Sequence, residues 1–110
     1  MNSDRFGLTE ATIEKIAGVL AGHPQVKQAL LYGSRAKGNY KNGSDIDLTL
    51  MGQELQTDDL LQIMGELDDL LLPHMIDLSI FHQLNHPELI DHIQRVGIIF
   101  YERTPAPKRL

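Results

Sequence analysis

The stretch Leu30-Leu31-Tyr32-Gly33-Ser34-Arg35-Ala36-Lys37-Gly38, followed after Gly38 by a polar turn and then Asp45-Ile46-Asp47, decides how this chain folds. Residues 26–32 predict a strand that enters a Gly-Ser turn, and a second strand carries the two aspartates. Because successive side chains of a strand point to opposite faces, Asp45 and Asp47 share one face and Ile46 lies on the other. The pattern predicts a strand-turn-strand unit with one acidic face and one core face.

The Gly33-Ser34 turn has the chemistry of a phosphate cradle. A short helix is predicted from Arg35 to Lys37, ended by Gly38, and backbone N–H groups at a helix start favour an anion. Glycine lets a ligand approach without a Cβ in the way, and Ser34 adds a hydroxyl donor. The cations Arg35, Lys37 and Lys41 suit one triphosphate, although a solvated turn would use the same residues.

A third acid, Asp77, lies in the alternating run from Met75 to Phe81, which predicts another strand. If this strand neighbours the first, Asp77 joins Asp45 and Asp47 on one sheet face. Crowded carboxylates raise one another's pKa unless a cation neutralises them, and Mg²⁺ is usually held by one or two carboxylates, waters and phosphate oxygens. The cluster therefore indicates a magnesium site. The alternative is a set of acids on the exposed face of amphipathic strands.

Gly33-Ser34, ten intervening residues and then Asp45-Ile46-Asp47 resemble the signature of the DNA polymerase β-like nucleotidyltransferase superfamily. The short build resembles its minimal nucleotidyltransferase (MNT) branch. The resemblance implies transfer of a nucleoside monophosphate to a hydroxyl with release of pyrophosphate, using one or two Mg²⁺ ions. It implies catalytic and metal-binding roles for Asp45, Asp47 and Asp77, and nucleotide-binding roles for Gly33, Ser34, Arg35 and Lys37.

The family resemblance also implies a partner. MNT proteins are often the antitoxin half of a bacterial pair whose other half is a helical HEPN ribonuclease, and some resemble enzymes that attach AMP from ATP to a tyrosine of that toxin. We therefore expect an ATP-using antitoxin in a hetero-oligomer with a HEPN toxin. A non-catalytic module that masks its partner is the alternative, and a transferase for small molecules ranks lower because such enzymes usually carry an extra acceptor domain.

The sequence excludes two other motifs, one that binds phosphate and one that binds a metal ion. A P-loop needs Lys-Ser or Lys-Thr directly after its second glycine, whereas Asn39 follows Gly38. An EF-hand loop that began at Asp45 would need an Asp or Asn at the position of Thr49 and then a glycine. Neither Walker A nor calcium-loop chemistry fits this sequence.

Composition sets the outer limits of the prediction. The 110 residues predict one domain over residues 1–103, with a flexible tail over 104–110, and leave no room for an acceptor domain. A net charge of −5 argues against direct nucleic-acid binding, which relies on many Lys and Arg side chains. The absence of cysteine and of a long apolar run leads us to expect a cytoplasmic protein that does not engage a membrane.

The remaining elements are predicted from periodicity and caps. They complete a mixed α/β (α+β) fold, in which helices pack on one face of a small mixed sheet and the acidic face stays open. All five histidines are expected at the surface or at its boundary. The predicted helices start at the caps Thr9 and Thr57 and at Pro87, and their inward residues are Ile13, Ile16, Ala17 and Leu20, then Leu60, Met64, Leu67 and Leu71, then Leu89, Ile93 and Val96, before a last strand at Ile98–Tyr101.

Overall fold

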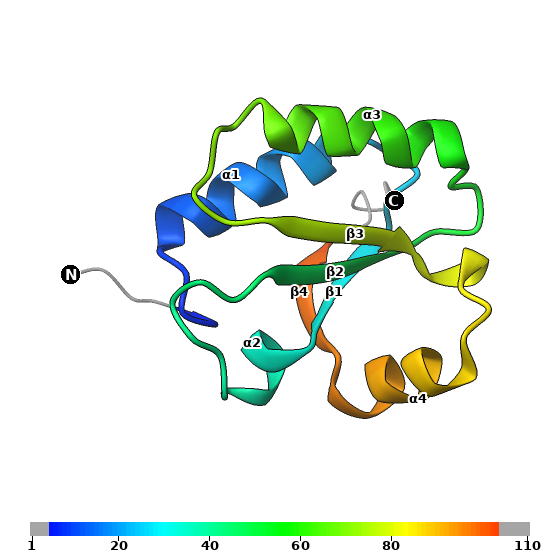
Figure 1. Ribbon diagram of the computed structural model, residues 1–110. Helices are drawn as coiled ribbons and strands as arrows, with labels where there is room; N and C mark the ends of the chain where they lie inside the picture. The colour runs from blue at the N-terminus through cyan, green and yellow to red at the C-terminus, as the bar shows by residue number, and fades with distance from the viewer. Residues whose placement is uncertain (1–4, 104–110) are drawn as a thin grey trace, which may run out of the picture.

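The computed structural model describes residues 5–103, and Figure 1 shows them as one sheet with helices on both sides. The predicted tail at 104–110 lies outside the described residues. Within the described range, no helix has the length and apolar character needed to cross a bilayer. The elements in chain order are α1 (Glu10–Ala21), β1 (Gln28–Tyr32), α2 (Ser34–Lys37), β2 (Ile46–Met51), α3 (Thr57–Asp68), β3 (Ile76–Ile80), the 3₁₀ turn η1 (Phe81–Gln83), α4 (Pro87–Val96) and β4 (Ile98–Glu102).

The four strands form a mixed sheet in the order β3-β2-β1-β4, which confirms the predicted fold class. β1 runs antiparallel to both β2 and β4, whereas β2 and β3 run parallel. In this register, Asp47 pairs with Tyr32 on one side and with Asp77 on the other. β2 and β3 are therefore neighbours, as the prediction for Asp77 required.

The helices are divided between the two faces of the sheet. α1 and α3 cover one face, as predicted, but α4 lies on the opposite side (Figure 1). The prediction that all helices share one face is therefore wrong for α4. The reason is that α4 has its own apolar anchor, Ile93, which is fully buried and belongs to no part of the main core beneath α1 and α3. A second apolar helix face needs a second sheet face to cover it.

The main core follows the predicted pattern in α1 and the strands. The Thr9 side chain caps α1 by accepting the Thr12 N–H at 3.2 Å, and Ile13, Ile16 and Leu20 are buried below it. The inward side chains of the strands meet this helix in one cluster. They include Ala29, Leu31, Ile46, Leu48, Leu50, Leu78 and Ile80.

The start and buried face of α3 differ from the prediction. Gln56, rather than Thr57, is the N-cap, and its N–H donates to Asp59 Oδ2 at 2.8 Å. α3 ends at Asp68, and Leu71 follows in a left-handed turn with 88% of its surface exposed. Met64 is also exposed. Ile63 and Leu67 are buried in the core, and Leu60 packs against it, as predicted. The apolar residues after Asp68 lie in a loop, so their helical spacing does not predict which of them face the core.

One histidine is buried, contrary to the expectation for all five. His23 follows α1 and is only 8% exposed, and its Nε2 lies 2.9 Å from Glu66 Oε1 on α3. This contact joins the end of α1 to α3 across the helical layer. The hydrogen bond to His23 lowers the pKa of Glu66 below its usual range.

We expect Glu66→Gln to lower the stability at pH 7, with the loss disappearing in acid. A carboxyl whose folded pKa is lowered stabilises the protein above its ordinary pKa, and that contribution is lost as the pH falls through the folded pKa. Urea unfolding of both proteins at pH 7 and pH 3 measures this. Glu14→Gln, an exposed change on α1, is the control, and an equal deficit at both pH values would contradict the prediction.

Candidate active site

Asp47 is the central residue of the acidic face. It lies in β2 between Tyr32 of β1 and Asp77 of β3, and Asp45 stands two residues earlier, directly before β2. Asp45 and Asp77 are exposed, whereas Asp47 is half-buried. The structure therefore brings the three predicted carboxylates to neighbouring positions on one sheet face.

The charges of this face act on one another. Burial raises the pKa of Asp47 above its usual value, and repulsion from Asp77 and then Asp45 raises it further. The His92 ring, in its charged form, and then Arg35 act in the opposite direction and offset only part of this effect. Burial together with the Asp77 carboxylate likewise raises the pKa of Tyr32. A ligand that brings positive charge would relieve the repulsion among these carboxylates.

The donor chemistry of this face fits a hard divalent cation. Within residues 5–103, no three His, Asp or Glu side chains already converge on one point that could hold a metal ion. Mg²⁺ does not need such a cage, because it is commonly bound by one or two carboxylates with waters and substrate phosphates as its other ligands. Asp47 and Asp77 lie on the adjacent strands β2 and β3 and repel one another, and neither strand contains a lysine. They meet that requirement.

Gly33 lies against the Asp47 carboxylate and has a backbone that only glycine adopts easily. Its φ is +76° and its ψ is −155°, and a Cβ at this position would overlap Asp47 Oδ2. Its N–H donates to Nε2 of His92 at 3.2 Å. The sequence argument explained this glycine by the approach of a ligand. The structure shows that the close neighbour is the carboxylate itself.

We expect Gly33→Ala to lower the free energy of unfolding by about 1–3 kcal/mol, the cost of a residue held in such a region. The displaced Asp47 carboxylate should also weaken any function of the site. Chemical denaturation measures the first effect. Gly18→Ala on α1, where an added Cβ meets nothing within 4 Å, is the matched control. Equal stability of the two variants would contradict the prediction.

The predicted short helix after the turn is present. α2 runs from Ser34 to Lys37, and its C-cap Gly38 has a left-handed φ of +86° and donates its N–H to Ser34 O at 2.9 Å. The Ser34 hydroxyl has no hydrogen-bond partner among residues 5–103, and Lys37 is exposed in the last turn. The Ser34 hydroxyl is thus available directly after Gly33, and the Lys37 side chain is exposed at the end of α2.

Arg35 differs from Ser34 and Lys37 because it is buried, with 2% of its surface exposed. Its Nη1 donates to Phe6 O at 2.8 Å, and its Nη2 donates to Ser44 O at 2.9 Å. The guanidinium also lies 5.3 Å from the centre of the Tyr40 ring. These contacts give Arg35 a structural role, and its predicted contact with nucleotide stays a prediction.

His92 is the residue that the sequence analysis missed. It projects from α4 to the Gly33 N–H, and its ring meets Tyr32 edge-on at a centroid distance of 6.1 Å. A signal was present, because His92 lies three residues after Leu89 and four before Val96. This spacing puts it beside the predicted inward stripe of α4.

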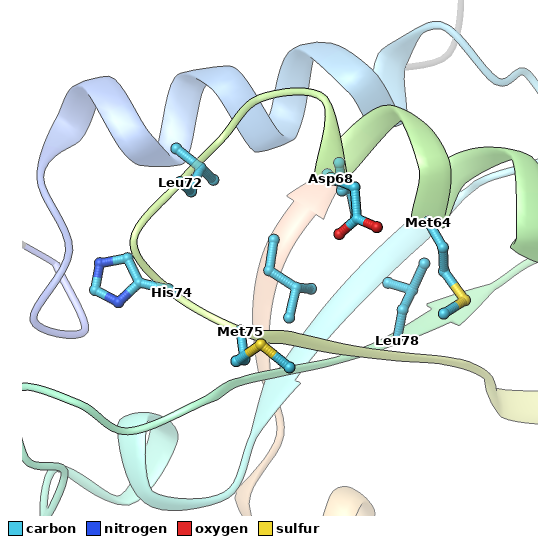
Figure 2. A pocket seen from close by; sticks show the side chains of 8 residues that line it. Met64, Asp68, Leu72, His74, Met75 and Leu78 are labelled. Atoms are coloured by element: carbon cyan, nitrogen blue, oxygen red, sulfur yellow. The ribbon is translucent and has the colours of Figure 1, made fainter.

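A separate hollow lies between α3 and β3, and Figure 2 shows Asp68 and His74 at its margin with apolar side chains between them. None of the predicted site residues lines it. The lining consists of Met64, Leu67, Asp68, Leu72, His74, Met75, Ile76 and Leu78.

The fold and the acidic strands define a nucleotidyltransferase class. Residues 14–106 match the family described as "Polymerase beta, Nucleotidyltransferase", so the chain belongs to this family and the predicted resemblance is confirmed. No curated protein matches the chain.

Several solved structures share the fold. One, a toxin-antitoxin with AMP-PNP, is 20% identical with a TM-score of 0.67 and covers 83% of this chain and 73% of its own. A second is the MNT antitoxin in complex with a tri-AMPylated HEPN toxin from Shewanella oneidensis, which is 18% identical with a TM-score of 0.64 over 86% and 72% of the two chains. A third, described as a putative nucleotidyltransferase from Sulfolobus solfataricus, is 18% identical with a TM-score of 0.52 over 94% and 93%. At these identities the likeness establishes the fold.

Proposed function

We propose that this chain transfers AMP from ATP to a tyrosine hydroxyl of a HEPN toxin and acts as its antitoxin, using Mg²⁺. The observation that carries the proposal is the register of β1, β2 and β3, which sets Asp47 beside Asp77 and next to the Gly33-Ser34 turn. Family membership supports a nucleotidyltransferase, and members of this superfamily generally use divalent metals. The relatives captured with AMP-PNP and with an AMPylated HEPN toxin support the choice of nucleotide and partner.

The proposed reaction assigns a role to each group of this chain. Asp45 and Asp47 would hold Mg²⁺, with Asp77 beside them, and the ion when bound would neutralise charge on the phosphates. Ser34 would donate to a phosphate oxygen, and Lys37, in the last turn of α2, would add positive charge. The tyrosine oxygen bonds to the α-phosphorus, the bond from that phosphorus to the bridging oxygen breaks, and pyrophosphate leaves. Asp77, which is exposed, would accept the hydroxyl proton.

The test is label transfer to the co-purified partner. Each of the four α-labelled nucleoside triphosphates is incubated with the complex and Mg²⁺, and the partner is then examined for covalent label. Asp45→Asn/Asp47→Asn should abolish transfer. Asp58→Asn/Asp68→Asn removes the same two charges from exposed positions on α3 and should leave transfer intact.

The same experiment separates the enzyme from a masking antitoxin. Label on the partner with ATP, lost only in the Asp45/Asp47 variant, is the expected result. If no nucleotide gives label while the Asp45/Asp47 variant still inhibits the toxin's ribonuclease activity, the catalytic proposal fails. The chain would then act by covering its partner.

A further inference from the structure

The Gly33 N–H is occupied although Gly33 belongs to the predicted phosphate cradle. The acceptor is Nε2 of His92, 59 residues further along the chain, at 3.2 Å. A backbone N–H only donates, so Nε2 of His92 is the acceptor of this hydrogen bond. The Gly33 N–H is therefore committed within the protein, whereas the Ser34 hydroxyl is available.

His92 is held firmly in this position. α4 is capped at its start by the His86 ring, which accepts the Leu89 N–H at 3.1 Å, and Ile93 is fully buried next to His92. At its end, the Gly97 N–H donates to Ile93 O at 2.8 Å, and β4 begins one residue later. β4 pairs with β1, the strand that leads into Gly33. Gly33, the donor, directly follows β1. His92, the acceptor, lies on the helix that leads into β4, which pairs with β1, so both partners are held by β1.

The contact acts on the carboxylate through the backbone. The Gly33 backbone faces the Asp47 carboxylate at close range, because a Cβ added at Gly33 would overlap Asp47 Oδ2. His92 also packs edge-on against Tyr32, the cross-strand partner of Asp47. His92 therefore contacts two residues next to Asp47: Gly33, which faces its carboxylate, and Tyr32, its cross-strand partner.

We propose that His92 is a positioning residue of this site: it keeps the Gly33 N–H, also when nucleotide is bound, and so fixes the Asp47 carboxylate, while Ser34 supplies the phosphate contact of the turn. The catalytic part of this inference rests on the proposed nucleotidyl transfer. The hydrogen bond and its persistence with nucleotide can be tested independently of catalysis.

The first measurement is NMR scalar coupling across the N–H···N hydrogen bond between Gly33 and His92 Nε2 in isotope-labelled protein. It is recorded on the free protein and with Mg²⁺ and AMP-PNP. We expect the coupling in both states. Absence of the coupling in the free protein, or its loss when AMP-PNP binds, would overturn the proposal, because a phosphate would then have taken the Gly33 N–H.

The second measurement compares variants in the transfer reaction with the partner. His92→Leu removes the acceptor, and we expect kcat to fall about 10- to 100-fold, the cost of a small misplacement at a reacting centre, with a smaller change in KM for ATP. His92→Gln, whose side-chain oxygen can accept the same N–H, should recover much of kcat. Gln94→Leu on the exposed face of α4 is the control.

The outcomes distinguish the two proposals. Unchanged kcat in His92→Leu, or tighter AMP-PNP binding by that variant, contradicts the positioning role. If the unmodified protein transfers no label, the proposed function fails, and the coupling measured with and without AMP-PNP still decides whether His92 holds Gly33.

Discussion

Replacing Asp47 with asparagine is expected to reduce nucleotidyl transfer at least about 10³-fold, because the metal charge that it would hold is worth several kcal/mol of transition-state stabilisation. The same change should make the protein more stable at pH 7. The ionised Asp47 is partly buried between Asp77 and Asp45, and both burial and repulsion oppose its charge. Asparagine keeps the shape and removes that charge.

The gain in stability has a defined pH dependence. A carboxyl with a raised folded pKa makes the native protein take up protons more readily, so its ionised form costs stability at neutral pH. The advantage of Asp47→Asn should open as the pH rises above about 3.9, the ordinary aspartate value, and be complete above the folded pKa. Thermal unfolding without Mg²⁺ from pH 3 to 7, beside Asp58→Asn, measures it. A lower melting temperature for Asp47→Asn at pH 7 would show that the carboxylate stabilises the fold.

Replacing Arg35 with methionine is expected to cost about 3 kcal/mol or more of stability, the largest loss of any single change considered. Two carbonyl oxygens, those of Phe6 and Ser44, would lose a charged donor, at roughly 1.5–3 kcal/mol for each hydrogen bond. The Ser44 carbonyl directly precedes Asp45, so the loop that delivers this carboxylate should loosen as well.

Thermal unfolding of Arg35→Met should show a fall of more than about 10 °C for a domain of this size. Arg35→Lys tests the geometry, since an ammonium on a flexible stem cannot reproduce the planar fork that bonds both carbonyls. Lys37→Met, on the exposed side of α2, is the matched control. A melting temperature of Arg35→Met within about 2 °C of the parent, a difference of less than about 1 kcal/mol, would refute a structural role.

The acidic strands and the turn were predictable because their information is local. Alternation placed Asp45 and Asp47 on one face, and the repeated pattern around Asp77 indicated a neighbouring strand. The register of β2 and β3 then confirmed that neighbourhood. The family signature also contains Asp45 and Asp47, so the alternation pattern and the family resemblance indicated the same segment.

The features that were missed depend on contacts between distant segments. Arg35 looked like a surface cation because no local pattern shows that the carbonyl of Phe6 comes to meet it. His92 became part of the site only because α4 crosses to the other face of the sheet (Figure 1). The end of α3 was misplaced because Leu70, Leu71 and Leu72 continue an apolar run past Asp68, and apolar residues alone do not mark where a helix stops.

The sheet order has a consequence for biosynthesis. β1 lies between β2 and β4, so the strand that leads into Gly33 acquires its second neighbour only after the ribosome has made residues 98–102. A nascent chain released after η1 would contain the whole Gly-Ser and aspartate signature and still lack His92 and one half of the pairing of β1. Completion of the site therefore requires translation through β4, and a product terminated before α4 would have the motif without the assembled centre.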